Sequence, residues 1–303
     1  MSKNAKKAKV RAVNSALIRK PIQRKFYLFL LPTFLAFCIG FLWPFLQGIY
    51  LSFCSFTTTS DATFVGLANY ASALKDPGFR HAFGFTALVT VASLVLINLF
   101  AFAVAYALTR NIRGSNLFRG VFFMPNLIGG IVLAYIWKMI FSSLMPRDIQ
   151  LDTTLGYWAL IIVLCWQHIG YMMIIYIAGL QAVSTDMLEA AKIDGANGWQ
   201  SLLHITIPSV MPSITICTFL TLTNSFKLFD QNMALNGGDP IVRIAGTKIK
   251  TTEMLALNIY NTFYGSSKVA RGAGQAKAVL FFILVAAIAL AQLRLTREKE
   301  VQR

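Results

Sequence analysis

Six apolar runs, each long enough to cross a bilayer, leave this 303-residue chain few possible folds. A helical span needs about 20 apolar residues. Hydrocarbon offers no hydrogen-bond partner for a free backbone amide, so a spanning run of this kind must be a helix. The sequence therefore predicts an all-α integral membrane protein with six transmembrane helices, at about 26–53, 82–109, 117–141, 155–180, 208–229 and 275–295.

The composition agrees with a membrane protein. Hydrophobic residues make up 56% of the chain and charged residues 13%, whereas a soluble domain usually carries about 25% charged residues. The net charge of +16 could indicate a nucleic-acid binder, but nine Lys and Arg and no acid gather in residues 1–25, directly before the first apolar run. That position predicts a cytoplasmic tail beside anionic lipid headgroups. We expect the lipid bilayer as a partner and no nucleic acid.

The distribution of Lys and Arg predicts the orientation. The proposed cytoplasmic segments hold nine in 1–25, three in 110–119, one in 181–207 and four in 294–303; the opposite loops hold two, one and five. Since cytoplasmic segments carry the excess of positive charge, both termini are predicted to be cytoplasmic. The predicted organisation is a basic N-terminal tail (1–25), a membrane domain (26–296) with a polar loop at 181–207, and a cytoplasmic C-terminal tail (297–303).

Motifs for catalysis are missing. The chain has no G-x-x-x-x-G-K-[ST] sequence to hold a nucleotide's phosphates and magnesium. Its four cysteines do not lie at metal-ligand spacing, and its three histidines fall in separate regions. We therefore predict that the chain is not an enzyme, hydrolyses no ATP itself, and holds neither a metal nor a cofactor.

The polar stretch 189–208 reads EAAKIDGANGWQSLLHITIP and lies between two predicted spans. We predict a helix of about nine residues, with Asp186 as N-cap and Glu189 at the third helical position. Gly195 is predicted to end it in a left-handed conformation. Two interpretations stay open: a docking element that faces a soluble partner, or an amphipathic linker on the bilayer surface.

Polar residues inside the spans need a reason, because burying them in a bilayer is unfavourable. Rings and amides at mid-membrane suit a path for a neutral, hydroxyl-rich solute, since rings stack on its apolar faces and amides exchange hydrogen bonds with its hydroxyls. The alternative is that these residues tie helices together. The candidates are Trp166, Gln167 and Tyr171 in the fourth span and Thr221, Asn224 and Ser225 in the fifth.

The stretch at 189–208 resembles the Glu-Ala-Ala loop of permease subunits of bacterial binding-protein-dependent ABC importers. Their pattern is Glu-Ala-Ala, three residues, Gly, nine residues, Ile, one residue, Leu-Pro; here Ile207 replaces the leucine. In that family the loop carries the contact with the ATPase. The coupling residues that the resemblance implies are Glu189, Ala190, Ala191, Asp194, Gly195, Ile205 and Pro208.

The resemblance covers nearly the whole chain and is greatest to maltose-type and glycerol-phosphate-type sugar permeases. FVGLANYASALKDPGF (64–79) and SFKLFDQNMALNGGDP (225–240) carry it, while GGDP and the basic insert RIAGTKIK depart from the family's outer loop. It implies the six-helix fold of type I ABC importers, located in the bacterial cytoplasmic membrane. The chain would translocate a carbohydrate or related solute, driven by ATP hydrolysis on a separate subunit. The implied partners are a second permease, a dimeric cytoplasmic ATPase that binds ATP-Mg, an extracytoplasmic solute-binding protein and the sugar.

The residues alone leave two other classes of membrane protein open. A stand-alone secondary transporter or channel would need its own coupling-ion groups, such as carboxylates inside the membrane, and the only candidate in the predicted spans is Asp230, at a span's end. A membrane-embedded scaffold would need none. The solute is not identified: an oligosaccharide, a monosaccharide, a polyol and glycerol phosphate all fit.

Overall fold

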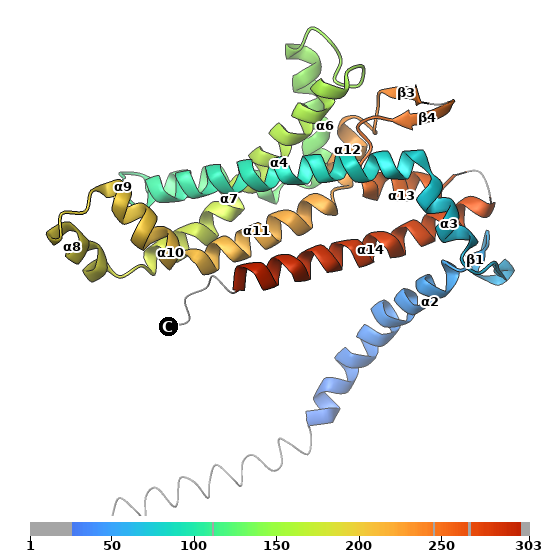
Figure 1. Ribbon diagram of the computed structural model, residues 1–303, viewed down its shortest axis with the longest axis horizontal. Coiled ribbons are helices and arrows are strands. Elements are labelled where there is room, and N and C mark those ends of the chain that lie inside the picture. Colours follow the sequence, from blue (N-terminus) through green and yellow to red (C-terminus); the bar gives the residue numbers. More distant parts are fainter. Residues whose placement is uncertain (1–25, 111, 245, 266–267, 298–303) are drawn as a thin grey trace, which may run out of the picture.

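The computed structural model describes residues 26–110, 112–244, 246–265 and 268–297, and these are mostly helical (Figure 1). Four helices are long and apolar enough to cross a membrane: Phe26–Leu51, α4 (Pro77–Leu108), α7 (Thr153–Gln181), and Arg271–Arg294 within α14 (Lys268–Arg297). The first contains a π-helical turn, η1 (Cys38–Leu42), followed by α2 (Trp43–Leu51). The predicted tails lie outside the described residues, apart from Arg297.

The third predicted span is not one helix, so the prediction of a continuous helix over 117–141 is wrong. Its segments are α5 (Ser115–Phe123), η3 (Met124–Leu127) and α6 (Gly130–Leu144), with a bend of 101° between the two halves. Pro125 has no N–H to continue the ladder, and two glycines follow the turn. A broken helix at membrane depth needs new partners for its backbone. The Ile128 carbonyl accepts a hydrogen bond from Gln167 Nε2 at 3.2 Å.

The fifth predicted span is also bent. It begins as α9 (Gly198–Ser201), continues through the π-helical η4 (Leu202–Thr206) and α10 (Ile207–Ser209), and turns by 69° into α11 (Met211–Phe226). Prolines at 208 and 212 flank the bend and remove two backbone donors. The described residues thus hold four continuous candidate spans, or six if each bent pair crosses once.

The long helices α4, α7, α11 and α14 lie side by side and form the bundle (Figure 1). Between helices in lipid, close packing and hydrogen bonds replace the hydrophobic effect. Fully buried Ala101 and Ala105 belong to the main core cluster. Nearby, the Tyr176 hydroxyl donates to Asn98 Oδ1 at 2.8 Å, and Asn98 Nδ2 donates to Thr221 Oγ1 at 3.3 Å. These bonds join α4, α7 and α11.

The two ends of the bundle carry different structures. One end, called the α8 end here, carries α8 (Thr185–Ile193), α9 and the last residues of α14 (Figure 1). The opposite α13 end carries two short hairpins, which amend the all-α prediction to a mostly helical fold. Its elements are β1 (Cys54–Ser55), η2 (Thr59–Asp61), β2 (Thr63–Phe64), α3 (Ala68–Lys75), α12 (Asp230–Leu235), β3 (Ile241–Ile244), β4 (Thr247–Lys250) and α13 (Leu255–Phe263).

Candidate coupling site and solute cavity

The start of α8 differs from the prediction. The helix begins at Thr185 after the extended residue Ser184, which makes no side-chain capping bond. The prediction that Asp186 is the N-cap is therefore wrong, because it lies in the first turn, and Glu189 is the fifth helical position instead of the third. Ser184, Thr185 and Asp186 are all cap-forming residue types, so the sequence alone does not select one.

The end of α8 follows the prediction. Gly195 has φ +83°, in the left-handed region that favours glycine. Its N–H donates to the Lys192 carbonyl at 3.1 Å, and the Ala196 N–H donates to the Ala191 carbonyl at 2.8 Å. This pair of bonds is a Schellman motif. A Cβ at Gly195 would meet nothing within 4 Å, so backbone conformation alone calls for glycine here.

A reciprocal capping box starts the next helix. Asn197 Oδ1 accepts from the Gln200 N–H, and Gln200 Oε1 accepts from the Asn197 N–H, each at 2.8 Å. The Schellman motif ends α8 and the capping box starts α9, so the two helices are separated by a tight turn. The loop holds its shape through backbone and side-chain hydrogen bonds that lie within the loop itself.

One face of α8 is open to solvent. No residue of α8 is buried, and Asp186, Glu189, Ala190 and Ile193 are all exposed. Their spacing of three, four and seven residues places them on one side of the helix. Ile193 is 86% exposed, an unusual position for a large apolar side chain that has two carboxylates on the same face. Asp194, another predicted coupling residue, is the exposed C-cap.

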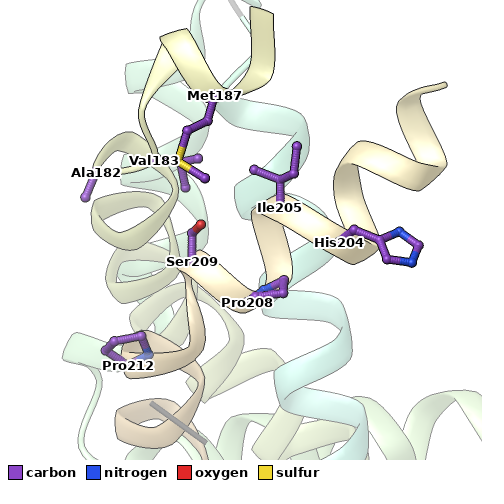
Figure 2. Close-up of a pocket in the computed structure, with 8 residues that line it drawn as sticks. All are labelled: Ala182, Val183, Met187, His204, Ile205, Pro208, Ser209 and Pro212. Carbon is purple, nitrogen blue, oxygen red and sulfur yellow. The ribbon is translucent and has the colours of Figure 1, made fainter. Parts of the chain in front are cut away.

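Beneath α8 lies a cavity of about 190 Å³ between the end of α7 and the α10 segment (Figure 2). Met187 reaches into it from α8 and points toward Val183, while the His204 ring points away. The predicted coupling residues Ile205 and Pro208 line this cavity. The structure therefore divides the predicted set: Glu189 and Ala190 lie on the outward face, and Ile205 and Pro208 lie behind the helix.

A second cavity, of about 300 Å³, lies where α7, α11 and α12 meet, and we call it the solute cavity. His168 lines it from the middle of α7, and most of its other lining residues follow the end of α11. Asn224 and Lys227 line it from α11, and Asp230 and Gln231 from α12. It joins amide, cationic and carboxylate groups at a depth where polar groups are unfavourable without a function.

The other predicted path residues are distributed around this cavity. Gln167 is buried and accepts a hydrogen bond from the cavity-lining Gln231 Nε2 at 2.7 Å. Trp166 is 42% exposed and meets Trp137 edge-on at 5.5 Å. Tyr171, Thr221 and Ser225 do not line it: Tyr171 packs against the main core, Thr221 donates to the Cys217 carbonyl at 2.8 Å, and Ser225 is buried.

The α13 end holds a buried charge that was not among the predicted site residues. Lys277 is 2% exposed and forms an ion pair with Asp76 at 2.6 Å. It also donates to Asn258 Oδ1 at 2.9 Å and to Thr262 Oγ1 at 2.7 Å. Glu253 accepts from Asn258 and Asn261. We call these six residues the Lys277 cluster. The one available signal was a lysine inside the sixth apolar run.

A bundle of long apolar helices is the architecture of a multi-pass membrane protein. Residues 97–298 match the family described as the inner membrane component of binding-protein-dependent transport systems. This match covers more than half of the chain. The chain therefore belongs to that family and is a multi-pass component of the bacterial inner membrane, as its resemblance predicted.

Named relatives agree over nearly the full length. The chain is 41% identical over 288 residues to the probable starch degradation products transport system permease protein AmyD of Thermoanaerobacterium thermosulfurigenes, covering 91% of this chain and 95% of that protein. It is 30% identical over 298 residues to the multiple sugar-binding transport system permease protein MsmF of Streptococcus mutans, covering 94% and 99%.

Among solved structures, the chain shares its fold with a bacterial ABC transporter that imports the acidic polysaccharide alginate. The TM-score is 0.74 at 18% sequence identity, and the match covers 93% of this chain and 98% of that chain.

Proposed function

We propose that this chain is one permease half of an ABC importer for a carbohydrate, and that α8 docks in a cytoplasmic ATPase. The observation that carries the proposal is the exposed face of α8, where Asp186, Glu189 and Ile193 present carboxylates and an apolar side chain to solvent. Such a face favours a partner groove with basic and apolar groups. It supports the docking interpretation over a linker on the bilayer surface, because carboxylates are repelled by anionic headgroups.

The proposed topology has six spans, with the α8 end and both termini in the cytoplasm. The excess of Lys and Arg in the segments at that end supports it. The last turn of α14 lies at the same end as α8 (Figure 1). Residues 26–296 would form the membrane domain, with residues 1–25 and 297–303 as cytoplasmic tails. The chain itself contributes no catalysis, and its energy comes from ATP on the partner subunit.

The proposed partners follow from the family and its relatives. Binding-protein-dependent transport requires a solute-binding protein on the outer side, here the α13 end. A second permease would complete the path, and the exposed apolar helix Phe26–Leu51 is available to it or to lipid. The substrate class is carbohydrate, because two relatives are described as permeases for starch degradation products and for multiple sugars.

The solute cavity is our proposed contact point for that carbohydrate. Asn224 and Gln231 offer amides that both donate and accept, which suits hydroxyl groups. Gln167 holds Gln231 in place and also pairs with the broken third span. We propose Trp166 and Tyr171 as neighbouring surfaces of the path, and Thr221 and Ser225 as supports from within the core.

The docking proposal is tested by replacing Gly195 with Arg and measuring uptake and ATPase activity of the assembled importer. Because a left-handed residue with a Cβ is unfavourable by about 1–2 kcal/mol, the turn after α8 should shift and transport should fall at least tenfold. Gly195→Asn is the matched control, since asparagine tolerates this conformation. Full transport by the Arg variant in an assembled complex would overturn the docking role.

The solute contact is tested by Asn224→Ala. The loss of a neutral hydrogen bond should raise the KM for uptake about fivefold, with the complex still assembled. Thr223→Ala is the control on the same helix, because Thr223 bonds the Phe219 and Leu220 carbonyls of its own helix and does not line the cavity. Equal effects of the two substitutions would remove Asn224 from the path.

A further inference from the structure

A third cavity also borders α8 and shares Val183 with the cavity of Figure 2. It has a volume of about 390 Å³ and is bounded by the ends of α4 and α7, by α8 and by the α9–η4 segment. Arg110 and Lys192 bring positive charge to it from two different elements. Tyr106, Thr109, Ser201 and Thr206 bring hydroxyl groups. We call it the Arg110–Lys192 cavity.

The charges of this cavity have one sign. No Asp or Glu lines it among the described residues. The acids closest in sequence to Lys192 are Glu189, on the outward face of α8, and Asp194, the exposed C-cap, and neither lines the cavity. Two cations that share a cavity without a carboxylate favour an anion between them, because each repels the other when the cavity holds only water.

The position of Arg110 is fixed by its neighbours. Its guanidinium lies 4.4 Å from the centre of the Tyr106 ring and donates to the Tyr106 hydroxyl. The guanidinium therefore has N–H groups left for a ligand, since it carries five donors. Guanidinium groups match phosphate oxygens well, and an ammonium such as that of Lys192 binds phosphate as a point charge.

The cavity lies where two spans end, at Leu108 of α4 and Gln181 of α7. Trp199, next to the cavity-lining Gly198, is 67% exposed, and tryptophan is typical of the membrane–water interface. In the proposed topology this is the cytoplasmic surface, where anionic lipids give a negative potential and each Lys or Arg near the surface gains about 1 kcal/mol.

We propose that the Arg110–Lys192 cavity binds a phosphate-bearing anion at the cytoplasmic membrane surface. The phosphate is either the phosphodiester of an anionic lipid or a free phosphate from the cytoplasm. The inference rests on the proposed topology. A phosphate held by both cations would join the end of α4 to α8, and so connect the docking helix to the bundle.

The lipid arm of the test uses the assembled importer in nanodiscs of phosphatidylcholine with increasing phosphatidylglycerol, and counts retained lipids by native mass spectrometry. Arg110→Gln and Lys192→Gln should each weaken phosphatidylglycerol retention about fivefold, and the double variant about 25-fold. Lys192→Arg should keep it. Arg113→Gln is the matched control, because Arg113 follows on the same loop but does not line the cavity.

The second arm measures binding of radiolabelled inorganic phosphate by equilibrium dialysis in pure phosphatidylcholine nanodiscs. If the variants lose only phosphatidylglycerol retention, the ligand is a lipid. If they lose binding of inorganic phosphate, the ligand is a soluble phosphate. Either result supports the site. Unchanged binding of both probes by the double variant overturns it. Neither readout needs turnover, so failure here is separate from failure of docking, which the Gly195→Arg transport assay reports.

Discussion

At the α13 end, Lys277 lies 2% exposed among Asp76, Asn258 and Thr262, and its three hydrogen bonds join α14 to α13 and to the start of α4. At the α8 end, no residue of α8 is buried, and the bonds that shape the loop lie within the loop. Both ends are polar, but the buried charged side chains of the described residues, Lys277 and Glu253, lie at the α13 end.

This difference fits what each end has to do. Loops that move in a functional cycle come from the part of a protein with low local stability, whereas a buried and fully paired polar network is rigid. An α8 loop with its own caps can keep its shape while it moves relative to the bundle. The Lys277 cluster, in contrast, joins α14 and the start of α4 to α13. Four substitutions test this contrast, in order of decreasing effect.

Asp76→Asn should have the largest effect. It keeps an oxygen that can cap α4, since Asp76 Oδ1 accepts from the Gly78 N–H, but it leaves the buried Lys277 ammonium without its counter-charge. Breaking a buried pair from one side costs about 3 kcal/mol or more. We expect the free energy of unfolding to fall by this amount when the purified chain is unfolded by titration with a denaturing detergent.

The double variant Asp76→Asn/Lys277→Met separates charge from packing. It removes both charges and should recover most of the stability that the single variant loses, because no uncompensated charge stays buried. If the double variant is no more stable than Asp76→Asn, the ion pair is not what stabilises this end.

Glu253→Ala should have the next largest effect. Glu253 is 5% exposed, and its two oxygens accept from Asn258 Nδ2 at 2.7 Å and Asn261 Nδ2 at 2.5 Å. Removing them leaves the buried Asn258 donor unpaired, which costs about 2 kcal/mol in the same unfolding experiment. Glu253→Gln is the control: rotation of the Asn261 amide can restore its bond, so it should lose less. Equal losses would contradict this arrangement.

The sequence predicts some of these features and not others, for physical reasons. Hydropathy predicts the fourth span, 155–180 against the observed Thr153–Gln181, because length and apolarity suffice. It does not predict the break after Pro125, where the Ile128 carbonyl accepts a hydrogen bond from Gln167, 39 positions after Ile128. The Lys277–Asp76 pair joins residues 201 positions apart, and no local pattern signals it.

The candidate sites divide in the same way. Gly195 is predictable because a helix end followed by this turn needs a left-handed residue. The solute cavity is predictable only in part: Asn224 lines it, but so do Asp230 and Gln231 of α12, a helix that no hydrophobic period predicts. Thr221 has a hydroxyl group that could contact a solute, but in this fold the hydroxyl oxygen accepts a hydrogen bond from Asn98.

Asn197→Ala should have a smaller effect that is confined to the α8 end. It removes the capping box with Gln200, and loss of such a cap costs about 1 kcal/mol. Since the capping box lies within the loop, amide exchange in residues 198–201 should accelerate about fivefold, while global unfolding is unchanged. A matching shift in global unfolding would show that the loop is part of the bundle's stability.

Asp186→Ala should have the smallest effect, and it tests the same loop from its other side. As a cap, Asp186 would contribute as much as Asn197 does. In the first turn of α8 it contributes only through the helix dipole, about 0.3 kcal/mol at an exposed position. Amide exchange in α8 should therefore accelerate less than about twofold. Acceleration equal to that of Asn197→Ala would mean that Asp186, and not Ser184, is the N-cap of α8. Because Asp186 lies on the exposed face with Glu189 and Ile193, this substitution should still weaken ATPase docking. It would thereby separate the loop's binding function from its folding.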